Sequence, residues 1–138
     1  MENKGQSGFK IQNIILLEDN FKRINEVKFG DDLDNNLNIN IEVNLAGDIV
    51  NVVETANFVQ KNNDGIEQVI IMVKMIGIFQ REGDAAISDM DKFGQINGAA
   101  IIFPFIREHI SNLSLKACIP AIMLPPVNFV SLYERRKK

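Results

Sequence analysis

The clearest structural signal in the chain lies in residues 37–79, LNINIEVNLAGDIVNVVETANFVQKNNDGIEQVIIMVKMIGIF. The segment opens on a strict alternation, because every odd position of Leu37–Leu45 is apolar and every even position is asparagine or glutamate. A helix would scatter these apolar side chains around its circumference, whereas a β-strand places them on one face. The alternation therefore predicts a half-buried strand over residues 37–45.

Two turns divide the rest of this segment. Ala46-Gly47-Asp48 predicts a tight turn into a strand at about residues 49–60. Asn62-Asn63-Asp64-Gly65 predicts a hairpin turn into a strand at 66–79, because Asn, Asp and Gly tolerate positive φ angles. Upstream, residues 9–17 are apolar at odd positions with one break at Asn13, which predicts a further strand. Four strands joined in this way indicate an antiparallel sheet.

The strand expected at residues 66–79 is apolar on both faces, interrupted by Gln68 and Lys74. An antiparallel sheet with one face in water alternates apolar and polar side chains instead. We therefore expect another layer, another subunit or a bound partner to cover its second face.

The apolar period changes after Gly94. Ile102, Ile106, His109 or Ile110, and Leu113 fall at helical spacing, which predicts a helix ending near Lys116 with Pro104 in its first turn or at a kink. Three prolines, at 120, 125 and 126, then enforce an extended crossover. Asn128 is expected to cap a last short helix from Phe129 to about Arg135.

The fold class expected from these patterns is α+β. It is a four-stranded antiparallel sheet followed by a long helix, a Pro-containing crossover and a short C-terminal helix. We expect a single domain over residues 1–138, with a core at about 8–133 and with 1–7 and 134–138 flexible. One long helix cannot cover both faces of the sheet, so self-association is expected.

Composition supports a chain with a real core. Of the 138 residues 46% are apolar, which excludes wholesale disorder, and the length suits one domain. The longest apolar run, residues 99–106, is far short of the roughly 20 residues of a membrane-spanning helix. The first ten residues lack the apolar region of a secretory signal, and the single cysteine favours a reducing compartment. A soluble, cytoplasmic protein is expected.

Charge is distributed unevenly along the chain. Residues 1–92 carry 16 acidic and 9 basic side chains, whereas 93–138 carry 2 and 6 and end on Arg135-Arg136-Lys137-Lys138. This basic end either attracts phosphates or an acidic partner, or is a solvated terminus. With an acidic body and no interleaved aromatic residues, the pattern does not indicate nucleic-acid binding.

The sequence offers no catalytic constellation. His109 is the only histidine and lies near the apolar face of the expected helix, which favours a hydrogen-bonded packing role. Cys118 follows an apolar stretch and is interpreted as a buried, inert thiol. Asp31, Asp32 and Asp34 lack the spacing of a calcium loop and are interpreted as a solvated turn. We therefore expect no enzyme activity, no cofactor and no metal site.

A family resemblance is carried by an ordered set of motifs. Phe103-Pro104-Phe105, Arg107-Glu108 and Pro126-Val127-Asn128-Phe129 follow one another in the C-terminal half, and residues 9–12 and Gly77-Ile78-Phe79 match as well. The chain resembles SecB-type protein-export chaperones over roughly residues 8–133.

The resemblance implies a cytoplasmic homotetramer, a dimer of dimers in which long helices lie between two eight-stranded sheets. Such proteins hold unfolded preproteins or other non-native polypeptides in apolar grooves without ATP, and many deliver them to the SecA motor. The groove is expected where the crossover and final helix lie over the sheet, with these client-binding residues: Phe29, Ile122, Leu124, Phe129, Leu132 and Tyr133, and Ile76 and Ile78 beneath them. The expected oligomer interface comprises Phe9, Ile11, Ile102, Ile106, His109 and Leu113.

A SecA-type partner surface is implied at Glu18, Lys22, Ile70 and Met72. Glu18 keeps an acidic family position, whereas Lys22 and Met72 stand where the family has acidic residues. These departures leave open a SecB-like chaperone dedicated to one client, such as an antitoxin. Two other classes remain open from the apolar surface itself, a small hydrophobic-ligand binding protein and a purely structural oligomerisation module.

Overall fold

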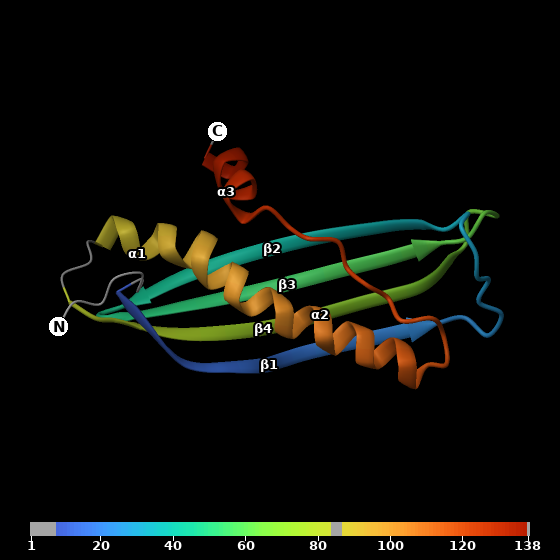
Figure 1. The fold of residues 1–138 in the computed structure, drawn as a ribbon, viewed down its shortest axis with the longest axis horizontal. Helices are drawn as coiled ribbons and strands as arrows, with labels where there is room; N and C mark the ends of the chain where they lie inside the picture. The colour runs from blue at the N-terminus through green and yellow to red at the C-terminus, as the bar shows by residue number, and fades with distance from the viewer. Residues whose placement is uncertain (1–7, 84–86, 138) are drawn as a thin grey trace.

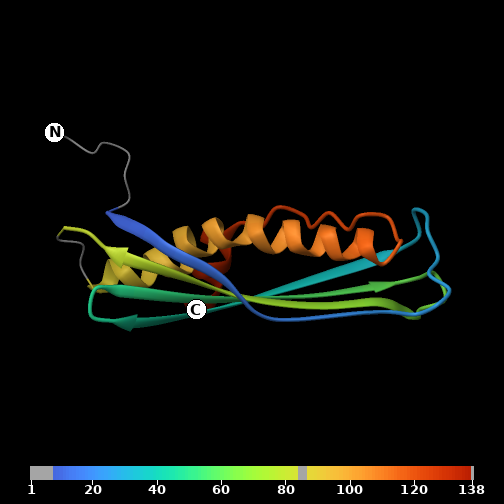
Figure 2. The ribbon, with the colours of Figure 1, turned by 90° about the horizontal axis from the view of Figure 1, so that it is seen from below.

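The computed structural model describes residues 8–83 and 87–137 as one elongated sheet with a layer of helices on one face (Figures 1 and 2). The four strands are β1 (Phe9–Arg23), β2 (Asp34–Ala46), β3 (Ile49–Lys61) and β4 (Glu67–Arg81). All neighbours pair antiparallel in the order β1-β4-β3-β2. The predicted four-stranded antiparallel sheet is therefore confirmed. The residues 1–7 and Lys138, expected to be flexible, lie outside the described residues.

Both predicted turns are present and owe their shape to local chemistry. Gly47 and Gly65 take φ angles of 61° and 78°, the left-handed region that glycine adopts without strain. In the second turn the side-chain oxygen of Asn62 accepts hydrogen bonds from the backbone N–H groups of Asp64 and Ile66, at 2.9 and 3.1 Å. The Asn-Asn-Asp-Gly sequence thus fixes the register of β3 and β4.

Strand β1 departs from the predicted alternation. Irregularities between Ile11 and Asn13 and between Leu16 and Glu18 each shift the register against β4. Each β-bulge moves the following side chains to the other face of the strand. Consequently Ile14 and Phe21 pack against the core, and the prediction that residues 9–17 share one face at odd positions was wrong.

The helical layer begins earlier than predicted. Helix α1 (Ile87–Phe93), a π-helical turn η1 (Gly94–Gly98) and α2 (Ala99–Lys116) form one run that crosses the sheet diagonally (Figure 1). Gly94 and Gly98 permit close contact with the sheet rather than ending a helix. A Cβ atom on Gly94 would lie 2.8 Å from a methyl group of Val43. Pro104 lies inside α2, not in the first turn of the run, and is exposed to solvent.

The core fills the space between this run and one face of the sheet. Alternate side chains of β3 and β4 are fully buried there, including Val50, Val52, Val73 and Phe79. The ring of Phe93 stacks on Phe9 with centroids 3.9 Å apart and meets Phe79 edge-on at 5.3 Å. The opposite face of β4 carries Ile70, Met72, Ile76 and Ile78, all only partly covered or exposed.

After α2 the chain crosses back over the sheet to α3 (Phe129–Lys137), which lies beyond β2 (Figure 1). The predicted cap is confirmed, because the side-chain oxygen of Asn128 accepts a hydrogen bond from the Ser131 N–H at 3.0 Å. Arg136 donates to the backbone carbonyl oxygens of Ile39 and Ile41, which attaches α3 to the edge of β2. No helix in the described part of the chain is long and apolar enough to span a membrane.

Candidate binding groove

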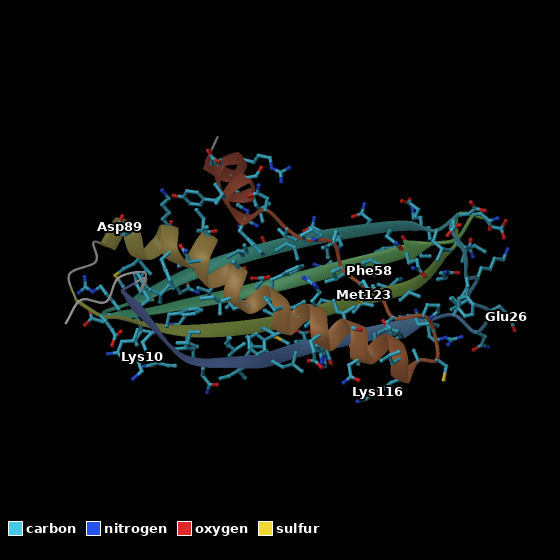
Figure 3. The ribbon with its side chains drawn as sticks, in the orientation of Figure 1. Lys10, Glu26, Phe58, Asp89, Lys116 and Met123 are labelled. Atoms are coloured by element: carbon cyan, nitrogen blue, oxygen red, sulfur yellow. The ribbon has the colours of Figure 1, made fainter. Side chains whose placement is uncertain are left out.

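An apolar groove of about 230 Å³ lies between the loop that joins β1 to β2 and the crossover that joins α2 to α3. The loop contributes Val27, Phe29 and Leu33, and the crossover contributes Ile119, Ile122 and Met123 among others. Phe58 of β3 lines the groove from the sheet, and Met123 lines it from the crossover. Both residues are labelled in Figure 3. We call this feature the loop–crossover groove. It presents an apolar concave surface with two exposed side chains at its rim. Phe29 is 62% exposed and Met123 is 70% exposed.

The walls of the groove are attached to the sheet at defined points. Arg23, the last residue of β1, donates hydrogen bonds to the backbone carbonyl oxygens of Ile24 and Asn25 in the loop and of Ala117 at the end of α2. One guanidinium therefore links both walls, and its charge lies at the C-terminal end of the helix dipole of α2.

The helix end itself turns through Cys118. This residue takes a φ angle of 57°, and the Ile119 N–H returns to the Ser114 carbonyl at 3.2 Å, the pattern of a left-handed helix cap. The prediction of a buried thiol was wrong, because Cys118 is exposed. The cap sends the crossover back over the sheet, and the side chains of Ile119, Ile122 and Leu124 are buried beneath it.

A second concavity, of about 360 Å³, lies farther along the crossover, next to α3. It is lined by Leu37 and Ile39 of β2, by residues 125–128 of the crossover and by Leu132 of α3, with Arg135 at its margin. The two concavities share Pro125 and follow one another along the proline-rich crossover, so that together they offer apolar side chains to an extended segment.

The residues predicted to bind a client divide into three groups in the structure. Phe29 and Ile122 line the loop–crossover groove and Leu132 lines the second concavity, while Tyr133 is half-buried on α3. Leu124 and Phe129 are core residues, and Phe129 meets Phe103 edge-on at 5.7 Å. Ile76 and Ile78 do not lie beneath the crossover as predicted. They alternate with the buried Met75, Gly77 and Phe79 and so occupy the opposite face of the sheet.

That opposite face gathers the residues predicted for a SecA-type partner. The strand register places Glu18 opposite Lys74, and Lys22 opposite Ile70, with Met72 between these positions on β4. Glu18, Lys22 and Ile70 are exposed and Met72 is half-buried. We call this surface the outer sheet face.

Several residues predicted for an oligomer interface are used within the chain. Ile102 and Ile106 are fully buried against the chain's own sheet, and Phe9 stacks on Phe93. The apolar stripe of α2 packs on the sheet beneath it, so Ile102 and Ile106 expose no side-chain surface to a second copy, whereas the half-buried Phe9 stays a predicted interface residue. His109 makes a 2.7 Å hydrogen bond from Nε2 to a carboxylate oxygen of Asp19 on β1, as its packing role predicted. Leu113 is half-buried, and Ile11 stays exposed on the edge strand.

Sequence reasoning missed three exposed apolar residues. Met123 stands at the groove rim, and Phe105 and Leu115 lie 51% and 61% exposed on the solvent side of α2. A wide concavity of about 670 Å³ runs along this side of the helix from Pro104 to Leu115. The apolar residues of α2 therefore occupy two faces of the helix, which a search for one amphipathic stripe does not detect.

The core also contains one ionisable side chain without a partner. Glu54 of β3 is fully buried on the helix-facing side of the sheet, and neither carboxyl oxygen has a hydrogen-bond partner among the described residues. In the strand register it lies between Ile41 of β2 and Met75 of β4. Removal from water raises the pKa of Glu54 to about 8, so the carboxyl group keeps its proton at neutral pH.

Comparison with known proteins assigns this architecture to a family. The family profile described as preprotein translocase subunit SecB matches residues 2–138. The chain belongs to the SecB family. Protein-export protein SecB of Halorhodospira halophila is 35% identical over 94 residues, which cover 68% of this chain and 53% of that protein. SecB of Pseudomonas savastanoi pv. phaseolicola is 40% identical over 91 residues, 64% of this chain and 54% of that protein.

The match to these two SecB proteins therefore spans about half of their length. A relative of similar size, the uncharacterized protein MJ0357 of Methanocaldococcus jannaschii, is 30% identical over 138 residues, 96% of this chain and 86% of that protein. Among solved structures, the Mycobacterium tuberculosis SecB-like chaperone Rv1957, in complex with a ChAD peptide from the HigA1 antitoxin, superposes with a TM-score of 0.78. It covers 88% of this chain and 92% of its own at 15% identity, which shows a common SecB-like fold.

Proposed function

We propose that this SecB-family chain is an ATP-independent chaperone that holds non-native polypeptides in the loop–crossover groove and its continuation beside α3. The observation that supports the proposal best is the exposure of Phe29 and Met123 at the rim of an apolar concavity. A holdase must offer apolar surface to compete with collapse of its client, and binding to the unfolded state delays folding by mass action. The flexible thioether of Met123 adapts to different client side chains.

Suppression of aggregation tests this proposal. At a near-stoichiometric ratio the wild-type protein should slow the aggregation or refolding of a chemically denatured test protein without ATP. Replacing both Phe29 and Met123 by serine should remove most of the effect. Ile66→Ser is the matched control, because Ile66 is also exposed (48%) but does not line the groove. Equal activity of the two variants would contradict the assignment of the groove.

We propose a homotetramer, a dimer of dimers, as the working assembly. Strand β1 pairs only with β4 among the described strands, which leaves an edge for a second copy. Phe105 and Leu115 on the solvent side of α2 supply apolar surface for contact between helical layers. Native mass spectrometry distinguishes the four-chain assembly from a monomer, which would contradict this part of the proposal.

Protein export in the cytoplasm is the proposed setting, with SecA as a candidate partner at the outer sheet face. Glu18, Lys22, Ile70 and Met72 lie together there, but Lys22 and Met72 give this surface less negative charge than the family pattern. A pull-down from native cytoplasm, with and without a SecA homologue, tests this partner. The relevant comparison is wild type against Met72→Glu, which should strengthen SecA capture if the surface is used.

A chaperone dedicated to one client is the second candidate. It is favoured by the similarity of fold to Rv1957, whose structure holds a peptide from an antitoxin. Capture of one adjacent-gene product in preference to many preproteins would support it. For a small hydrophobic molecule the loop–crossover groove is a poor fit, because its volume of about 230 Å³ is below the range of roughly 300–1,000 Å³ for ligand sites. A binding role, rather than an enzyme activity, accords with this surface.

A further inference from the structure

The loop wall of the groove is held by a buried glutamine that the sequence analysis noted only as an interruption. Gln68 of β4 is fully buried, and its side chain makes three hydrogen bonds of 2.9 Å. Its oxygen accepts from the backbone N–H of Lys28, and its amide nitrogen donates to the backbone carbonyl of the same residue. The third bond runs from that nitrogen to the side-chain oxygen of Gln60.

This geometry immobilises one particular residue of the loop. The backbone N–H and C=O of Lys28 are both bonded to one side-chain amide, so the backbone at Lys28 cannot rotate without breaking two partly buried hydrogen bonds. The backbone N–H of Ile24 also donates to the carbonyl of Gln68, at 3.1 Å. The next residue in the chain is Phe29, whose ring forms the exposed rim of the groove.

The hydrogen-bonded chain continues from the wall into the lining of the groove. Gln60 donates from its side-chain nitrogen to the side-chain oxygen of Asn35, at 3.0 Å, and both residues line the groove. One buried amide thus connects the loop wall to the two polar groups that line the cavity. The ion pair between Lys28 and Asp64 adds a further attachment, but both side chains are more than half exposed and such pairs contribute little.

From these contacts we infer that Gln68 is the positioning residue of the loop–crossover groove, fixing Phe29 at the rim and thereby the affinity for an extended polypeptide. The inference rests on the proposed function. A buried amide is a costly choice for filling space, since an apolar residue of similar size needs no partners. The side chain of Gln68 bonds only to the loop wall, at Lys28, and to the groove lining, at Gln60, among the described residues. The equally buried side chain of Glu54 has no hydrogen-bond partner in the same part of the chain.

A double-mutant cycle tests the inference. The probe is fluorescently labelled, reduced and carboxymethylated α-lactalbumin, which stays unfolded. Phe29→Ala should weaken binding about tenfold, the effect of losing an aromatic anchor. Gln68→Leu should weaken binding to a similar degree, and the double variant should be no weaker than either single variant, because both act through one ring. Gln80→Leu is the matched control, since Gln80 lies on the same strand and its side chain bonds, within the described part of the chain, only to the exposed Gln12.

The outcomes separate the inference from the proposed function. If Phe29→Ala leaves binding unchanged, or the wild type does not bind the probe, the proposed groove function is wrong. If Phe29→Ala weakens binding but Gln68→Leu does not, the positioning role alone is overturned. The same holds if the affinity loss of the double variant is the product of the two single losses. Thermal midpoint and native mass of each variant show whether Gln68→Leu is folded.

Hydrogen exchange on the wild-type protein gives a test that does not depend on a variant. The Lys28 amide donates to a buried oxygen and should exchange at least about tenfold more slowly than its intrinsic rate predicts, whereas the neighbouring Glu26 amide should not. Equal, fast exchange at both positions would overturn the inference.

Discussion

Burial of Glu54 without a partner makes stability depend on pH in a defined direction. The folded protein holds this proton up to a pKa of about 8, and the unfolded chain releases it near 4.5. Between these values the folded state binds more protons, so stability is greatest below pH 4.5, falls as pH rises and levels off above pH 8.

The size of the effect follows from the span of the two values. Each pKa unit corresponds to about 1.4 kcal/mol. The free energy of unfolding should therefore fall by about 4 kcal/mol between pH 5 and pH 8 from this group alone. Every other titratable group is common to the wild type and to a variant at position 54, so a comparison of the two proteins isolates this site. A glutamine at position 54 keeps the shape and removes the titration, so Glu54→Gln isolates the contribution of the carboxyl group.

The assay is urea unfolding at pH 5, 6, 7, 8 and 9, at one fixed protomer concentration because assembly also affects apparent stability. The free energies of unfolding of wild type and Glu54→Gln should differ least at pH 5. As pH rises to about 8 the wild type should lose stability relative to the variant. Parallel stability curves across this range would refute the reasoning. They would mean that the carboxyl group finds a partner or water in solution.

Four further substitutions test individual features of the fold. Gly77→Ala should lower the free energy of unfolding by about 1–3 kcal/mol in chemical denaturation, because the added Cβ would lie 2.7 Å from the Ile102 side chain; Gly98→Ala, with its nearest contact at 3.1 Å, should cost less. Cys118→Gly should raise the thermal midpoint by relieving a left-handed conformation, a gain of about 1 kcal/mol, and an unchanged midpoint would argue against the cap. Asn128→Ala should cost about 1 kcal/mol, seen as faster amide exchange at Ser131, and unaltered exchange there would show that the cap is not used.

The alternation in residues 37–79 was sufficient to predict the sheet, because each strand buries one face and each turn carries its own chemistry. The same rule failed in β1, where each of two bulges moves the following side chains to the other face of the strand. No residue type in β1 indicates where these bulges lie. The start of the helical layer was also missed, since the helical period was recognised only after Gly94, and Gly94 and Gly98 lie where the run contacts the sheet closely. The result was that α1 and η1 were not predicted.

The binding surface was predicted only in part. The prolines located the crossover, and the family resemblance pointed to Phe29 and Ile122, which line the groove. Local sequence could not tell which crossover side chains point inward, because extended segments held by prolines have no fixed period. Leu124 is therefore buried in the core while its neighbour Met123 is exposed at the rim. The roles of Gln60 and Gln68 depend on contacts between distant segments, which a strand pattern does not contain.

Mapping the bound client tests the central claim most directly. Hydrogen-exchange mass spectrometry of the wild-type protein, with and without carboxymethylated α-lactalbumin, would show where an unfolded chain lies. Binding in the loop–crossover groove predicts protection of residues 24–33 and 119–125 with little change on the outer sheet face. Protection confined to the outer sheet face, or none at saturating client, would contradict the account.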